Sequence, residues 1–145
     1  SLSKCFNSAS GAILAGSADF IEDLHHQRRM FGGSLAQAWP QAAVALHYAD
    51  GFLEAYRAAW STAETLFDLL DEDPVFRVER ITQGTHIVRL HVVDVSLPEF
   101  AERLRQRQVS IAPPAPDDQW LMLKINPSIL RVSPAQLVAV FRAAL

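Results

Sequence analysis

The amino-acid sequence predicts an α+β fold in which helices cover one face of an antiparallel sheet. Residues 52–70 repeat apolar side chains at helical spacing over several turns. Residues 76–92 change to an alternating apolar pattern around a Gln83–Gly84 turn, which is typical of a β-hairpin. After Gly51 the expected order is helix, hairpin, helix, strand, strand and helix. That order is typical of α+β layer architectures.

The chain begins with a serine-rich segment that contains Lys4 and leads into an apolar run. We expect Lys4 to lie in a loop and Ala12–Ala15 to form a buried strand. A lysine held against an apolar interior has its pKa lowered by desolvation, which makes its amine a usable nucleophile. The alternative from spacing alone is an ordinary surface lysine before an edge strand.

Three helices are expected between residues 17 and 71. The first begins at the N-cap Ser17 and extends to about Met30, ahead of a glycine pair. The second has a proline in its first turn and covers residues 40–49, before the turn-forming pair Asp50–Gly51. The third is the amphipathic helix 52–70, and we assign its aromatic side chains to the core.

The second half of the chain predicts two further helices and two short strands after the hairpin. The pattern Ser96–Glu99 is a capping box and predicts a helix that begins there. Strands are expected at residues 109–112 and 120–125, on either side of a proline-rich turn. A second capping box, Ser133–Gln136, opens the last helix.

Composition excludes several classes of protein. The 145 residues are 50% hydrophobic and carry a net charge of −3, so we expect no binding to nucleic acid. No apolar run approaches the ~20 residues needed to cross a bilayer, and no membrane association is expected. Cys5 is the single cysteine and has no internal partner. A cytoplasmic protein is the default expectation.

The titratable residues predict no metal site. The five histidines show no paired ligand spacing on one helix. His86 and His91 have opposite parity along the expected strand and would face opposite sides of the sheet. No glycine-rich nucleotide loop follows a strand.

Several motifs near the start of the chain keep their order and spacing relative to a known enzyme family. These motifs are Ser1-Leu-Ser-Lys4, Ser10-Gly-Ala-Ile-Leu-Ala-Gly16, Asp19-Phe-Ile21, Arg28-Arg-Met-Phe-Gly-Gly33 and Gln37. The set resembles the threonine aldolase and β-eliminating lyase family, which are fold-type I pyridoxal-phosphate (PLP) enzymes. The resemblance is continuous to about Phe52 and looser from there to the C-terminus.

The resemblance implies roles for four residues. Lys4 matches the lysine that forms the Schiff base with PLP, and Ser1 lies in the same cofactor-binding motif. Arg29 matches a basic position that reaches the PLP phosphate of a neighbouring subunit. Lys124 is the nearest match to an arginine that holds the substrate carboxylate. A lysine there offers a point charge in place of a planar fork, so the exchange is not conservative.

The resemblance also implies a division into two parts. Residues 1–50 would be the tail of the large PLP-binding domain, and residues 51–145 the small C-terminal α+β domain. In the family the remaining cofactor-binding groups precede the lysine. We therefore expect this chain to be the C-terminal portion of a longer enzyme, to bind PLP weakly or not at all alone, and to form a homodimer or homotetramer with the missing domain.

The expected function is that of a PLP-dependent lyase acting on a β-hydroxy or β-substituted amino acid. The reaction would be aldolase-type cleavage or β-elimination. Ala36 stands where threonine aldolases carry an arginine, and Gln37-Ala-Trp-Pro40 is closer to the lyase-like members, which argues against threonine as the substrate. The alternative is a non-catalytic α+β module for subunit assembly, or a degenerate relative.

Overall fold

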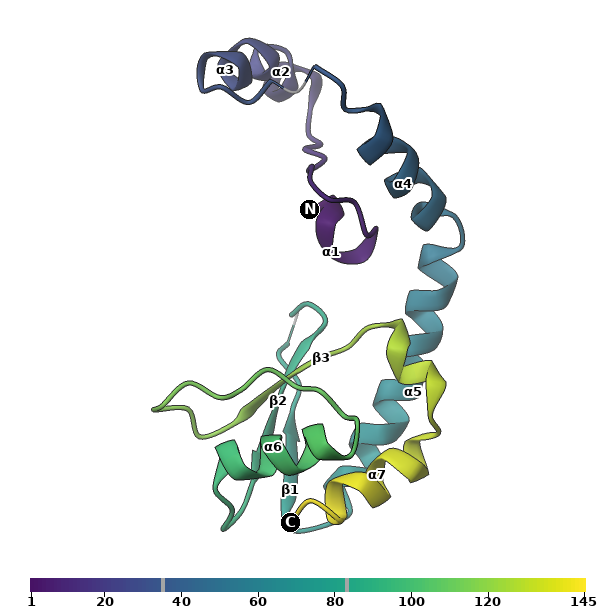
Figure 1. Ribbon diagram of the computed structural model, residues 1–145, viewed down its shortest axis with the longest axis vertical. Helices are drawn as coiled ribbons and strands as arrows, with labels where there is room; N and C mark the ends of the chain where they lie inside the picture. Colours follow the sequence, from purple (N-terminus) through teal and green to yellow (C-terminus); the bar gives the residue numbers. More distant parts are fainter. Residues whose placement is uncertain (35, 83) are drawn as a thin grey trace. The chain divides into compact units, whose positions relative to one another are not determined.

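A computed structural model describes residues 1–34, 36–82 and 84–145 of the chain. Its helices and its antiparallel sheet confirm the predicted α+β fold class (Figure 1). The chain divides into two compact units, Ser1–Leu53 and Glu54–Leu145. None of the described helices is long and apolar enough to cross a membrane.

The second unit holds the sheet and the helices that cover it. The helix α5 begins at Phe52, two residues before this unit, and supplies its first element. The elements, in chain order, are α5 (Phe52–Asp71), β1 (Phe76–Glu79), β2 (Ile87–Val92), α6 (Leu97–Gln106), β3 (Leu121–Lys124), the 3₁₀ helix η1 (Pro127–Arg131) and α7 (Pro134–Arg142).

The three strands form an antiparallel sheet in the order β1-β2-β3, which confirms the predicted hairpin. Its first pair places Glu79 opposite Arg89, and its second places Ile87 opposite Lys124. The turn between β1 and β2 includes Gly84, whose N–H donates to Ile81 O at 2.8 Å. The other half of the predicted turn, Gln83, lies outside the described residues.

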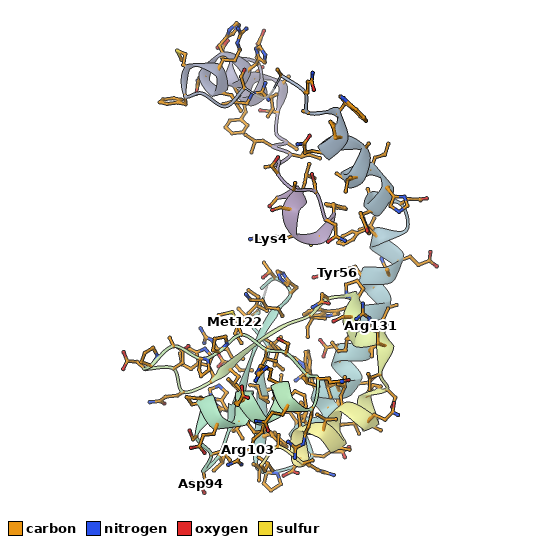
Figure 2. The ribbon with its side chains drawn as sticks, in the orientation of Figure 1. Lys4, Tyr56, Asp94, Arg103, Met122 and Arg131 are labelled. Atoms are coloured by element: carbon orange, nitrogen blue, oxygen red, sulfur yellow. The ribbon has the colours of Figure 1, made fainter. Side chains whose placement is uncertain are left out.

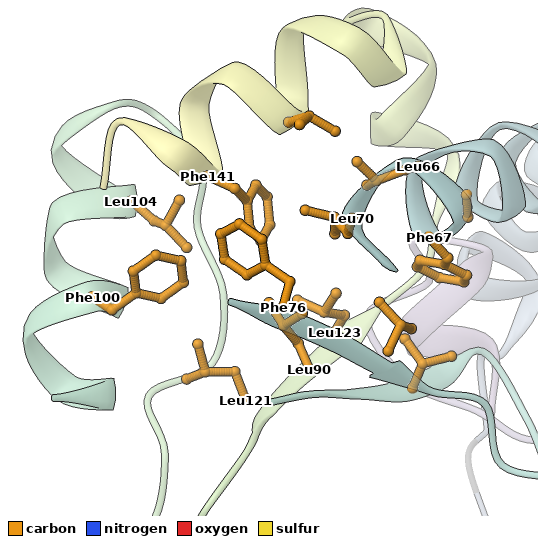
Figure 3. Close-up of a cluster of buried hydrophobic side chains, with 14 of the residues drawn as sticks. Leu66, Phe67, Leu70, Phe76, Leu90, Phe100, Leu104, Leu121, Leu123 and Phe141 are labelled. Atoms are coloured by element: carbon orange, nitrogen blue, oxygen red, sulfur yellow. The ribbon is translucent and has the colours of Figure 1, made fainter. Parts of the chain in front are cut away.

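One face of the sheet is buried against α5, α6 and α7. Alternate strand residues point into this core, as the period of a strand requires. Figure 3 shows the side chains of Phe76, Phe100 and Phe141 together in this cluster. Their ring centroids are 6.1–6.3 Å apart at tilted or edge-to-face angles, within the range of favourable aromatic pairs. The opposite face of the sheet carries polar side chains.

The two predicted capping boxes have different outcomes. Ser133 and Gln136 form the full reciprocal box at the start of α7. Ser96 is the N-cap of α6, but its side chain makes no capping hydrogen bond, so the first box is wrong. The carboxylate of Glu99, the other half of the predicted box, pairs instead with Arg103 Nη2 one turn along the helix, at 3.4 Å.

The strand predicted at residues 109–112 is also wrong, and that at 120–125 is confirmed within the shorter bounds of β3. The cause is local. Val109 N–H donates to Leu104 O at 3.0 Å and so belongs to the C-terminal cap of α6. The prolines at 113 and 114 then follow, and a proline has no N–H for a sheet hydrogen bond. Between the helix cap and the prolines, too few residues remain to form a paired strand.

The first unit is helical. Its elements are α1 (Leu2–Cys5), α2 (Ala18–Ile21), α3 (Leu24–Met30) and α4 (Trp39–Ala49). The predicted N-cap is confirmed, because Ser17 Oγ accepts from Phe20 N at 3.4 Å. The single helix predicted from Ser17 to about Met30 is instead two helices, since the chain turns at residues 22 and 23.

The strand predicted at Ala12–Ala15 is wrong. These residues are irregular, and the side chains of Ile13 and Leu14 are 75% and 65% exposed. A strand needs a neighbour for its backbone donors and acceptors, and the described residues of this unit include no other strand. Residues 12–15 therefore have the apolar pattern of a strand but no described neighbouring strand with which to form a sheet.

A buried serine fixes the segment that follows α1. The Ser8 hydroxyl donates to backbone carbonyls, lying 2.8 Å from Ser10 O and 3.1 Å from Gln41 O on α4. Leu2 N–H donates to Gly11 O at 2.9 Å, which closes residues 2–11 into a loop. Gly11 has a φ of +113°, a conformation that side chains disfavour. The loop thereby holds α1 in place beside α4.

Candidate functional site

Lys4 lies on α1 and not in a loop, which corrects the sequence-based prediction (Figure 2). Its side chain is exposed, so it is not held against an apolar interior as expected. The described residues provide it with no hydrogen bond or ion pair. The amine is therefore open to a reagent or cofactor that approaches from solvent. The closed 2–11 loop fixes the backbone that carries it.

The other three predicted site residues lie on separate elements. Ser1 is the N-cap of α1, and its Oγ lies 3.0 Å from Ser3 Oγ. Arg29 is in the last turn of α3 and is exposed. Lys124 ends β3 in the second unit and is also exposed. The structure thus places Ser1 and Lys4 on one short helix, while no described hydrogen bond or ion pair joins either residue to Arg29 or Lys124.

These residues fit part of what PLP requires. The cofactor needs an amine for its aldehyde, cations for its phosphate and a partner for its ring nitrogen. Lys4 supplies a free amine, and the guanidinium of Arg29 has no carboxylate partner among the described residues, so its charge is available to an anion. No described contact brings an acidic side chain to Lys4. The described part of the first unit therefore has an exposed amine and an exposed guanidinium, and no described contact brings the two together.

The sequence analysis missed a side-chain cluster on the open face of the sheet. Glu79 accepts from Arg89 Nη1 at 3.1 Å, and its other oxygen lies 3.1 Å from His91 Nε2. The Arg89 guanidinium lies 4.6 Å from the centre of the Trp120 ring, within cation–π range. The signal was the register, since Glu79 and Arg89 are directly opposite on β1 and β2.

This cluster lowers the pKa of one carboxyl group, that of Glu79. The hydrogen bond with His91, and then the charge of Arg89, hold the pKa of the Glu79 carboxyl below its ordinary value, against an opposing effect of burial. A carboxyl whose pKa is lower in the folded state adds stability above its unfolded pKa of about 4.3. That contribution disappears as pH falls through the lowered pKa.

We expect Glu79→Gln to flatten the acid limb of the stability profile. Between about pH 6 and pH 3 the free energy of unfolding of the original protein should fall more steeply than that of the variant. Urea denaturation at a series of pH values measures both slopes. The control is Glu72→Gln, an exposed acid without a described partner, which should leave the profile unchanged. Parallel acid limbs for the Glu79 variant and the original protein would contradict the assigned cluster.

The described residues contain no group of three or more histidine, cysteine or acidic side chains arranged to hold a metal ion. Cys5, on α1 with Lys4, is exposed and carries a free thiol. Among the described residues, therefore, the chemistry available on α1 is that of an amine and a thiol.

Comparison with known proteins identifies no relative from which a function could be inferred. No protein-family model matches the chain, and a search of curated proteins found no match. The motifs around Lys4 and the placement of its amine are thus the observations from which a function is argued.

Proposed function

We propose that this chain is the C-terminal part of a PLP-dependent lyase that acts on a β-hydroxy or β-substituted amino acid. Lys4 is the residue that holds the cofactor covalently. The observation that supports this role is the exposed, unpaired Lys4 amine on a helix whose backbone is fixed by the 2–11 loop. The order and spacing of the motifs that follow Lys4 support the same family of reactions.

Each site residue has a defined task in this proposal. Bound PLP supplies an electron sink for the bond that breaks in the substrate. Lys4 Nζ would hold the cofactor through its aldehyde group, and as a free amine it would accept a proton from the substrate. Arg29 provides positive charge for the phosphate, and Ser1 belongs to the cofactor-binding motif. Lys124 attracts the substrate carboxylate as a point charge, without the bidentate geometry of an arginine.

The placement of these groups requires an assembled protein. The described contacts do not join Arg29 or Lys124 to Lys4. In the proposed enzyme they act together through a homodimer or homotetramer, in which Arg29 serves the site of a neighbouring subunit. Outside that assembly, the exposed Lys4 amine has no described neighbour that would exclude water from it. The assembled site is where lyase chemistry is expected.

Borohydride reduction tests the cofactor role directly. Lys4 and Lys124 are the only lysines in the sequence, so an adduct within this chain can be assigned without ambiguity. The full-length protein is incubated with PLP, reduced and digested, and its peptides are mapped by mass spectrometry. We expect a pyridoxyl group on Lys4 and an unmodified Lys124. Reduced protein with an unmodified Lys4 would overturn the proposed function.

A non-catalytic role in subunit assembly is the second candidate. The first unit exposes many large apolar side chains, and exposed apolar surface is typical of interaction sites. The exposed side chains are Ile13, Leu14, Phe20, Met30, Phe31, Trp39, Val44, Leu46, Tyr48 and Leu53. An assembled oligomer that takes up no PLP in the reduction experiment would favour this role.

A further inference from the structure

A groove in the second unit lies outside the proposed covalent site. It has a volume of about 430 Å³, which is within the size range of small-molecule sites. One wall is the irregular segment 108–112, and the other is β3 with the 3₁₀ helix η1. Leu66 of α5 and Leu137 and Phe141 of α7 complete the apolar lining.

The groove follows the free edge of β3. Ile125 N–H donates to His86 O at 2.7 Å, toward β2. Backbone groups alternate in direction along an antiparallel strand, so the N–H groups of Met122 and Lys124 point away from β2. No described strand pairs with that edge. Two backbone donors are therefore available on the groove side.

The charged residues that line the groove are both cations. Lys124 and Arg131 are among its lining residues, and no aspartate or glutamate is. Neither cation has a side-chain hydrogen bond or ion pair in the described part of the chain. Most other arginines of this unit do have carboxylate partners, namely Arg80, Arg89, Arg103, Arg105 and Arg142.

A hydrogen-bonded turn shapes the polar end of the groove. Asn126 Nδ2 donates to Lys124 O at 3.0 Å, and Asn126 Oδ1 accepts from Ser128 N at 3.0 Å. Both ends of the amide are thus occupied within the turn. The Ser128 hydroxyl has no described partner, and Ser128 lines the groove. It adds a donor beside the cations and the free β3 edge.

We propose that this groove binds a carboxylate that carries an apolar chain or ring. Its negative charge complements Arg131, and its apolar part lies against side chains such as Ile111, Ile129 and Leu137. An anion is favoured because a groove with donors and cations but no acid attracts negative charge. An apolar body is favoured because most of the remaining lining is hydrophobic. Binding here requires neither PLP nor Lys4.

Nuclear magnetic resonance titration tests this site on the full chain. Isotope-labelled protein is titrated with octanoate, with neutral 1-octanol and with inorganic phosphate. We expect octanoate to give saturable shifts at groove residues such as Ile111, Ile129 and Val132, and the other two probes to bind more weakly. Arg131→Gln should weaken octanoate binding by about tenfold, which is typical of a lost hydrogen bond to a charged group. Arg131→Lys keeps the charge and should retain most of the affinity.

Matched variants separate this site from other surfaces. Arg77→Gln removes an exposed, unpaired cation on the open sheet face and should leave binding unchanged. Lys4→Ala should also leave it unchanged. Octanol binding as tight as that of octanoate, an unaltered affinity in Arg131→Gln, or loss of binding in Lys4→Ala would each overturn the proposal. Octanoate binding together with an unmodified Lys4 in the reduction experiment would overturn the proposed function alone.

Discussion

Phe100→Ala should lower the free energy of unfolding of the second unit by about 3–5 kcal/mol, the range typical of a fully buried phenylalanine. Phe100 lies on α6, is 0% exposed and contacts both Phe76 and Phe141 through its ring. Truncation removes these aromatic contacts and leaves a cavity that surrounding side chains fill only in part. Small domains have total stabilities of about 5–15 kcal/mol, so much of the folded state's margin would be lost.

Urea denaturation followed by circular dichroism measures this change. Phe31→Ala is the control of matched chemistry, because Phe31 is 87% exposed and its truncation should change stability by no more than about 0.5 kcal/mol. If Phe100→Ala proves too unstable to purify, Phe100→Leu keeps most of the volume and should cost less. Equal midpoints for Phe100→Ala and Phe31→Ala would contradict the packing of α6 against the sheet.

The second unit could be predicted because its signals are local and periodic. The amphipathic repeat of residues 52–70 and the alternation in β1 and β2 each identify an element from neighbouring residues alone. Both halves of the box form at Ser133, whereas at Ser96 the hydroxyl makes no capping bond and Glu99 pairs with Arg103. A capping pattern in the sequence indicates which side chains could form capping hydrogen bonds. The structure shows which of those hydrogen bonds form.

The two wrong strands failed for a different reason. Strand formation depends on a pairing neighbour that can be far away in sequence. Residues 12–15 have an apolar pattern but no described strand beside them, and residues 109–112 are limited by a helix cap and two prolines. Strand register also hid the contact of Arg89 with Glu79 on the opposite strand, and the contact of Arg89 with Trp120 joins residues far apart in the chain.

The candidate site was predictable only at the level of residue identity. The motif around Lys4 selected the amine, but its short helix and its exposure emerged from the fold of residues 2–11. Arg131 of the groove gave no sequence signal, because it comes to line one cavity with the free edge of β3 only through the fold of η1. Whether a charged side chain has an ion-pair partner is seen only in the three-dimensional structure.

Lys4→Ala and Lys4→Arg should both abolish covalent PLP attachment in the full-length protein. Neither variant has an amine that bonds to the cofactor's aldehyde, although the arginine variant would keep the positive charge. Because the proposed Lys4 amine also moves a proton during turnover, we expect the lyase rate to fall by about 10²- to 10⁴-fold, as for loss of a general base. The readouts are the borohydride adduct and turnover on a panel of β-hydroxy and β-substituted amino acids.

Lys124→Ala is the informative control, because it removes the only other lysine of this chain and leaves α1 untouched. It should keep the adduct on Lys4 and raise KM, since a point charge that attracts the substrate carboxylate is lost. The two lysines thus separate covalent attachment from substrate binding within one assay. Full turnover in Lys4→Ala would show that this amine has no chemical role, and an adduct lost in Lys124→Ala would move the covalent site to the second unit.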